Sequence, residues 1–160
     1  MPRRTILFVC TGNICRSPMA ERLLRHALSV EPEPLRSLRI ASVGVAAYPG
    51  DPASANSVRA LHSVGIPLED HRSRPLTQET LDETLVLFAM TPSHLRSVCS
   101  RYDRLPPYLH LMREFMEDGV SREIPDPYGA GLDEYEECRD SMIEAIPGIL
   151  RYLRKITAED

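Results

Sequence analysis

The segment from residue 5 to residue 18 places the tightest constraint on how this chain can fold. Residues 5–9 form a short apolar and β-branched run, which predicts a buried strand. Ser17 and Pro18 are typical of a helix N-cap and of a first helical residue. Only residues 10–16 lie between them, so the sequence predicts a strand and a helix joined by a tight loop.

The composition of this loop predicts an anion site that contains a nucleophile. Gly12 and Asn13 tolerate positive φ, so the backbone can turn its N–H groups inward as an anion-binding nest. The positive end of the helix points at the same spot, and Arg16 can bind two phosphate oxygens at once. Cys10 would lie beneath the phosphorus, in surroundings that favour the thiolate over the thiol. The alternative is that Cys10 is an ordinary buried cysteine and Arg16 a surface residue.

Apolar runs alternate with helical patterns along the rest of the chain. Strands are expected at residues 5–9, 38–43, 84–90 and 108–112, and helices at residues 18–28, 54–64, from 91–92 onward and 132–156. Pro147 and Gly148 are expected to kink or split the last helix. Strands separated by helices imply a parallel sheet with helices on both faces. Ligands bind such sheets beyond the carboxyl ends of the strands, where Cys10 falls.

Residues 10–21, with the sequence CTGNICRSPMAE, resemble the signature loop of the low-molecular-weight protein tyrosine phosphatases. The resemblance extends along nearly the whole chain, and the family has a bacterial branch that also includes protein arginine phosphatases. It implies a single domain over residues 1–160, an α/β three-layer αβα sandwich with a central four-stranded parallel sheet and with the phosphate-binding loop after the first strand. That loop would consist of Thr11, Gly12, Asn13, Ile14, Cys15, Arg16 and Ser17.

The second family signature is the Asp-Pro-Tyr-Gly segment at residues 126–129. Phosphoryl transfer to Cys10 needs an acid that protonates the leaving oxygen, and the family assigns this role to the Asp matching Asp126. The resemblance thus implies a hydrolase with a phosphocysteine intermediate and with Cys10, Arg16 and Asp126 as catalytic residues. No metal or cofactor is expected, since the loop already supplies a positive field. Taken alone, the segment would be only a turn, but a non-enzymatic phosphate-recognition module is hard to reconcile with three intact catalytic residues.

The family also implies a hydrogen-bond network that holds the loop and the thiolate. Its members here would be Asn13, Ser17, Ser42 and His71. Ser17 could then both cap the helix and donate its hydroxyl to Cys10. Taken alone, His71 lies in a polar segment close to prolines and is expected to be a surface loop residue.

Substrate choice depends on few residues. Tyr48 and Tyr128 could form the walls of a slot for a phosphorylated aromatic ring, although Tyr48 could equally be a packing or turn residue. The branch of arginine phosphatases resembles this chain in its single aromatic residue before glycine, here Tyr128 before Gly129. That branch carries threonine where this chain has Ile14, and the apolar Ile14 favours phosphotyrosine over phosphoarginine.

The other three cysteines bear on two questions, a possible disulfide with Cys10 and a possible arsenate reductase activity. The resemblance implies a reversible disulfide between Cys10 and Cys15 under peroxide, whereas the simpler interpretation is that Cys15 packs beneath the loop. A thioredoxin-coupled arsenate reductase needs a closely spaced resolving pair, but Cys99 and Cys138 are 39 residues apart. Both lie on helical patterns with apolar neighbours and are expected to be core thiols.

Composition limits the cell compartment and the partners. The chain has 160 residues, a formal net charge of −4 and four cysteines, which disfavours nucleic-acid binding and a disulfide scaffold. Its apolar runs are far shorter than the roughly 20 residues that a membrane helix needs, and no secretory signal precedes the first strand. We expect a cytoplasmic protein whose partners are a phosphorylated protein substrate and inorganic phosphate as product and competitive ligand, with no nucleic acid and no membrane.

Overall fold

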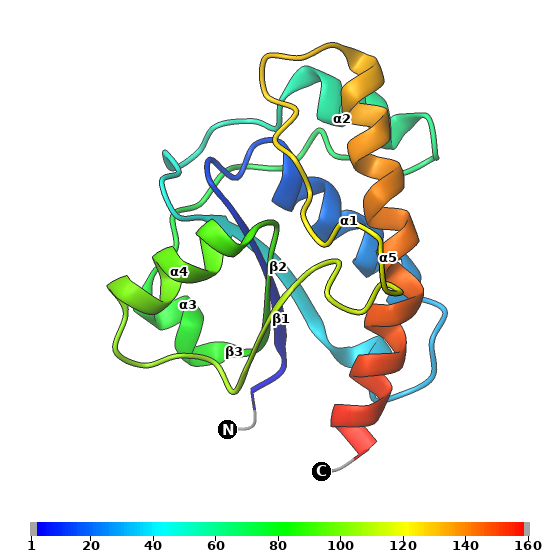
Figure 1. Cartoon of the computed structure of the whole chain (residues 1–160). Helices are drawn as coiled ribbons and strands as arrows, with labels where there is room; N and C mark the ends of the chain where they lie inside the picture. The colour runs from blue at the N-terminus through cyan, green and yellow to red at the C-terminus, as the bar shows by residue number, and fades with distance from the viewer. Residues whose placement is uncertain (1–2, 159–160) are drawn as a thin grey trace.

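The computed structural model describes residues 3–158, which form helices packed on both faces of a sheet (Figure 1). The strands are β1 (Thr5–Cys10), β2 (Arg39–Gly44), β3 (Thr84–Ala89) and β4 (Tyr108–Leu111). The helices are α1 (Arg16–Leu28), α2 (Ala55–His62), α3 (Gln78–Glu83), α4 (Pro92–Arg101) and α5 (Leu132–Ala158), with a 3-10 helix, η1, at Leu35–Ser37. Among these helices of residues 3–158, none is long and apolar enough to cross a membrane.

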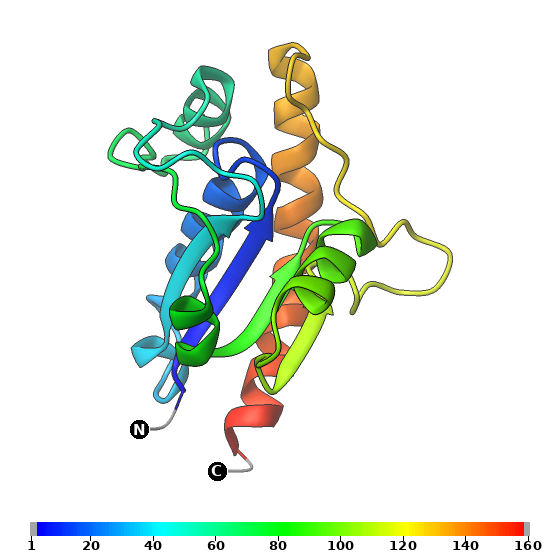
Figure 2. The same ribbon diagram turned by 90° about the vertical axis from the view of Figure 1, so that its left-hand side faces the viewer.

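The sheet is parallel and has the strand order β2-β1-β3-β4. Helices α1, α2 and α5 pack together on one face, whereas α3 and α4 lie on the other (Figures 1 and 2). A hydrophobic core lies on each face of the sheet: the first core is beneath α1, α2 and α5, and the second is beneath α3 and α4. The central strand β1 contributes Ile6 and Phe8 to the first core and Leu7 and Val9 to the second. This arrangement confirms the predicted fold class.

Helix α1 begins at Arg16, two residues before the predicted start at Pro18. Its N-cap is Cys15, which makes no side-chain capping bond, so the prediction of Ser17 as the N-cap is wrong. Ser17 lies inside the first turn instead, and its hydroxyl bonds with side chains outside the helix. The uncapped N–H groups of this turn remain available to an anion.

Helix α5 runs without interruption through Pro147, so the predicted split is wrong. The missing backbone bond costs about 3 kcal/mol, but side chains on both sides of the proline are buried in the first core. They include Met142, Ala145, Ile149 and Leu153. Burial of a Met, Ile or Leu side chain contributes about 1.5–3 kcal/mol, so the three of them outweigh that cost. Gly148 allows a close approach, because a Cβ atom there would lie 3.0 Å from Phe115 Cβ.

Helix α3 was not expected from the sequence. It has only six residues, and Thr77 caps it by accepting a hydrogen bond from the Thr80 N–H group. Its one fully buried residue is Leu81, which belongs to the second core. A helix this short has too few turns for hydrophobic periodicity to reveal it.

Two histidines are buried in the fold. His71 lies in the segment between α2 and α3, and His94 lies in the first turn of α4. Burial lowers the pKa of both imidazoles, and the pKa of His94 falls to about 4. Both rings therefore remain neutral at pH 7 in the folded protein.

Gly44, at the end of β2, is required by close backbone packing. A Cβ atom there would lie 2.5 Å from the main-chain oxygen of Thr11 and 3.0 Å from the main-chain nitrogen of Asn13. Gly44→Ala is therefore expected to destabilise the fold by about 1–3 kcal/mol, measured by urea unfolding. The control is Gly131→Ala, whose Cβ would meet only the end of the Glu134 side chain at 3.4 Å. Equal stability of the two variants would contradict this account.

Stability is expected to fall as the pH drops from about 6.5 toward 4, because the unfolded chain gains protons at His71 and His94 that the folded protein does not bind. His94 contributes up to about 1.4 kcal/mol per pH unit within this window, and His71, whose pKa is also lowered, adds to the slope below pH 6.5. Unfolding free energies measured at several pH values would show a shallower slope for His94→Asn. The exposed His62 provides the control, since His62→Asn should keep the wild-type slope. An unchanged slope in His94→Asn would refute the linkage.

Candidate active site

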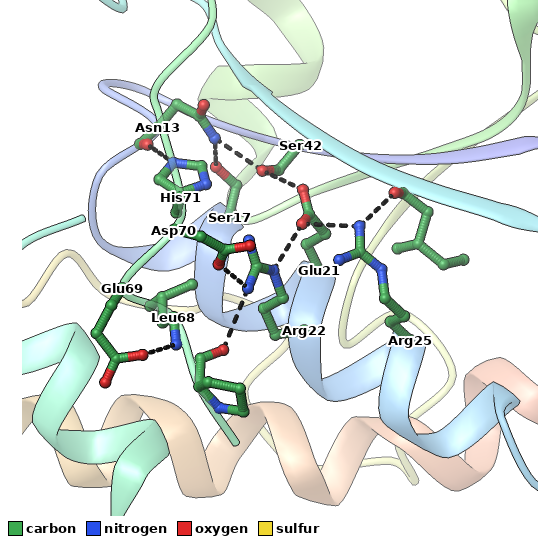
Figure 3. Close-up of polar contacts among 12 residues, drawn as sticks. Asn13, Ser17, Glu21, Arg22, Arg25, Ser42, Leu68, Glu69, Asp70 and His71 are labelled. Carbon is green, nitrogen blue, oxygen red and sulfur yellow. Dashed lines mark hydrogen bonds and ion pairs between the residues drawn. The ribbon is translucent and has the colours of Figure 1, made fainter. Parts of the chain in front are cut away.

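The loop after β1 is organised around Asn13. Its φ is 57°, so Asn13 adopts the left-handed conformation, whereas Gly12, the other residue expected to do so, does not. The Asn13 side chain donates to Ser17 Oγ at 2.8 Å and to Ser42 Oγ at 3.0 Å, as Figure 3 shows. Its Oδ1 atom accepts a bond from the Arg74 N–H group at 2.9 Å. The fully buried side chain thus joins α1, β2 and the segment that follows His71.

The nucleophile candidate, Cys10, is the last residue of β1 and is buried. Its Sγ atom lies 2.9 Å from Ser17 Oγ. Because Asn13 donates to Ser17 Oγ, the Ser17 hydroxyl proton is left for one of two acceptors, Cys10 Sγ or Val43 O, which is 3.4 Å away. A hydroxyl that donates to sulfur stabilises the thiolate form.

Glu21 extends this network, and sequence analysis did not find it. Its Oε1 atom accepts the Ser42 hydroxyl at 2.9 Å, and its Oε2 atom pairs with Arg22 and Arg25, each at 3.0 Å (Figure 3). Because Ser42 donates to Glu21, its oxygen must accept from Asn13. The only sequence signal was that Glu21 follows Ser17 by four residues, on the same face of a helix.

His71 lies under the loop and not on the surface. It is buried, and its Nε2 atom donates to the main-chain oxygen of Asn13 at 2.8 Å (Figure 3). The expectation of a surface loop residue is therefore wrong, because the polar segment folds back over the site. The neighbouring Asp70 does face solvent, where it pairs with Arg22 at 2.7 Å. The structure brings all four predicted network residues together.

Arg16 and Asp126 meet across the site. Arg16 is 4% exposed, and its guanidinium donates to the main-chain oxygen of Ile124 at 3.0 Å. It also lies 3.7 Å from Asp126 Oδ2, on a side chain that is 51% exposed. The Tyr128 N–H group donates to Asp126 Oδ1 at 3.0 Å, which fixes the carboxylate within its turn. Arg16 thus holds the segment of residues 124–126 next to the loop.

A cavity of about 250 Å³ opens at this point. Its lining residues are Cys10, Thr11, Gly12, Ile14, Cys15, Arg16, Asp126 and Tyr128. Tyr128 therefore lies where a slot wall was predicted. Tyr48 is 80% exposed and does not line this cavity, so the structure does not bring the second predicted wall to it.

All four cysteines are free. Cys15 lies 3.3 Å from the Tyr135 hydroxyl, and burial raises the pKa of its thiol. Cys138 is a core thiol, as predicted, and burial raises its pKa to about 12. Cys99 is exposed, so its prediction as a core thiol is wrong: the adjacent Val98 faces the core, and one helical residue turns the next side chain away.

His94 also belongs to the site, although the sequence did not single it out. Its Nε2 atom lies 2.9 Å from Thr11 Oγ1 in the loop, and its Nδ1 atom lies 3.1 Å from Thr91 Oγ1.

Within residues 3–158, no group of three or more His, Cys, Asp or Glu side chains could hold a metal ion.

Known proteins share this architecture. Residues 5–159 match the model of the low molecular weight phosphotyrosine protein phosphatase family. The protein-arginine-phosphatase of Bacillus subtilis is 35% identical over 150 residues, which is 94% of this chain and 97% of that protein. The low molecular weight protein-tyrosine-phosphatase Etp of Escherichia coli is 35% identical over 132 residues, or 82% of each chain.

The solved structure of the YwlE arginine phosphatase from Geobacillus stearothermophilus superposes with a TM-score of 0.83. That comparison covers 97% of this chain and 96% of the other, at 32% identity. Taken with the match over residues 5–159, these findings show that the chain belongs to the low molecular weight phosphotyrosine protein phosphatase family.

Proposed function

We propose that the protein hydrolyses phosphotyrosine in phosphorylated proteins through a phosphocysteine intermediate. One observation carries the proposal: a sulfur nucleophile, a guanidinium and a carboxylate line the same 250 Å³ cavity. These groups belong to Cys10, Arg16 and Asp126, and they are the three parts that metal-free phosphoryl transfer needs.

In the first step the Cys10 thiolate attacks phosphorus in line with the ester bond. A sulfur–phosphorus bond forms while the bond to the tyrosine oxygen breaks. Arg16 and the main-chain N–H groups of the loop stabilise the charge on the equatorial oxygens. Asp126 gives its proton to the departing phenolate, so the leaving group departs as neutral tyrosine.

In the second step water replaces the cysteine. Asp126, now a carboxylate, takes a proton from the attacking water, and the sulfur–phosphorus bond breaks. Inorganic phosphate leaves as the product, and it competes with substrate for the same loop. The Cys10 thiolate is restored, where the Ser17 hydroxyl lies 2.9 Å away to stabilise it. Neither step uses a metal ion or a cofactor.

The cavity wall favours an aromatic substrate. Ile14 contributes an apolar side chain beside Cys10, and Tyr128 lines the same cavity. An aromatic ring between them would bury apolar surface and gain ring contacts. Tyr48, which the structure places outside the cavity, would contact only parts of the substrate beyond the phosphorylated residue.

Protein arginine phosphatase activity is the second candidate, and two observations favour it. Two of the similar proteins, from Bacillus subtilis and Geobacillus stearothermophilus, are named protein-arginine-phosphatase. In addition, a single aromatic residue, Tyr128, precedes Gly129 in the acid segment. The apolar Ile14 opposes this candidate, because it offers no hydroxyl to a phosphoguanidinium.

The remaining parts of the proposal rest on length, charge and cysteine content. We infer one domain over residues 1–160 and a reducing, cytoplasmic location, with neither nucleic acid nor a membrane as partner. Cys15 is the proposed redox partner of Cys10, and both thiols are free in the structure.

Asp126→Ala is expected to slow hydrolysis according to the leaving group. Aryl phosphates with poor leaving groups should lose about 10²–10⁴ in kcat/KM, whereas p-nitrophenyl phosphate, with its good leaving group, should lose far less. Steady-state rates on a series of substituted phenyl phosphates would measure this dependence. Glu123→Ala removes a nearby exposed carboxylate and should keep the wild-type dependence. Equal losses for good and poor leaving groups would remove Asp126 from the acid role.

Matched phosphotyrosine and phosphoarginine peptides test the substrate. The wild-type protein is expected to prefer phosphotyrosine in kcat/KM, with Cys10→Ser as the inactive blank. Ile14→Thr should shift the ratio of the two kcat/KM values toward phosphoarginine by about tenfold, because it supplies a hydroxyl and removes apolar contact. A wild-type preference for phosphoarginine would establish the second candidate instead. An active Cys10→Ser protein would overturn the nucleophile for both.

A further inference from the structure

His94 is fixed between two threonine hydroxyls, one from the N-cap residue of its helix and one in the loop after β1. Its Nδ1 atom lies 3.1 Å from Thr91 Oγ1, and its Nε2 atom lies 2.9 Å from Thr11 Oγ1. The His94 side chain is buried, whereas Thr11 is exposed and lines the cavity beside Cys10. A buried imidazole thus contacts the cavity through a single hydroxyl.

The start of α4 is built to hold this ring. Thr91 is the N-cap residue and has the extended backbone in which a threonine side chain ordinarily accepts a bond from the first helical turn. Ser54 and Thr77 make such bonds at the starts of α2 and α3. Thr91 makes none, and its hydroxyl contacts His94 instead.

The ring is neutral at pH 7. Burial and the nearby Arg16 charge lower the pKa of His94 to about 4, and the opposing Asp126 charge does not offset them. A neutral imidazole has one N–H donor and one lone pair. The two threonine contacts therefore have one of two directions, according to which nitrogen carries the proton.

We propose that His94 holds the Nε2–H tautomer and positions the Thr11 hydroxyl as a hydrogen-bond donor to the bound phosphate group. Thr91 then donates to Nδ1, and Nε2–H donates to Thr11 Oγ1. The Thr11 proton is left to point into the cavity. Thr11 contacts the ligand, and His94 is a positioning residue that acts through it. The inference rests on the proposed function only in taking the cavity as a phosphate site.

The opposite direction of the hydrogen bond between Thr11 and His94 is unfavourable for anion binding. If Thr11 donated to Nε2, its oxygen would present only lone pairs to the cavity. Those lone pairs would repel a phosphate oxygen at the point where Arg16 and the loop attract it. A bound anion therefore selects the Nε2–H tautomer.

Affinity for inorganic phosphate, measured by calorimetry at pH 7, tests the proposal independently of the true substrate. Thr11→Val keeps the branched shape and should weaken phosphate binding about tenfold, as expected for one hydrogen bond to a charged partner. His94→Asn is too short to reach Thr11 and should weaken binding to a similar degree. His94→Gln places an amide donor near the position of Nε2 and should restore most of the affinity.

The double variant separates positioning from a general structural role. If His94 acts through Thr11, His94→Asn should have no further effect on phosphate affinity in the Thr11→Val background. Additive losses, or unchanged affinity in Thr11→Val, would overturn the proposal. Phosphate binding remains measurable whether the enzyme prefers phosphotyrosine or phosphoarginine, so the two proposals fail separately.

The wild-type protein provides a test that needs no variant. Nitrogen-15 NMR of the imidazole rings in the phosphate-saturated protein distinguishes the two tautomers and the imidazolium. We expect the His94 signals of an Nε2–H tautomer. The Nδ1–H tautomer or an imidazolium would overturn the proposal.

Discussion

The left-handed backbone of Asn13 is the constraint on which the candidate active site depends. This conformation costs on the order of 1 kcal/mol for a residue other than glycine, and it persists because the surrounding bonds fix it. The two ends of the Asn13 side chain and its main-chain oxygen all have partners, which lie on α1, on β2 and in the segment around His71. The loop is therefore held from three sides before any ligand arrives.

The parallel sheet explains how such distant residues meet. Cys10 ends β1, Ser42 lies near the end of β2, and Thr91 follows the end of β3, so all three lie at the carboxyl edge. Within this network Asn13 donates to Ser17 and Ser42, and Ser42 donates to Glu21. The Ser17 hydroxyl lies 2.9 Å from Cys10 Sγ. A buried network of this kind is stable only when each member has a partner, and no buried side-chain polar atom of the described residues lacks one.

Local chemistry made the centre of the site predictable. The loop residues are close in sequence, and the residue types limit the backbone conformations open to them, so the strand and the loop that follows it could be predicted. The residues that sequence analysis missed or misplaced depend on tertiary contacts. The carboxylate of Glu21 is indistinguishable from a solvated helix charge until Ser42 lies opposite it. The polarity of the segment around His71 indicates a loop but not its path over the site. A helical pattern located α4 but not which of Val98 and Cys99 faces the core.

The bond from Arg16 to the Ile124 carbonyl has a consequence for how the enzyme could diversify. One guanidinium lines the candidate site and at the same time binds the segment that carries Asp126. A sequence change that shifts this segment would therefore move Asp126 and the Arg16 guanidinium together. Ile14 and Tyr128 line the same cavity but take no part in this bond, so these two positions can change without breaking it. A change of substrate preference there would leave the contact between Arg16 and Ile124 in place.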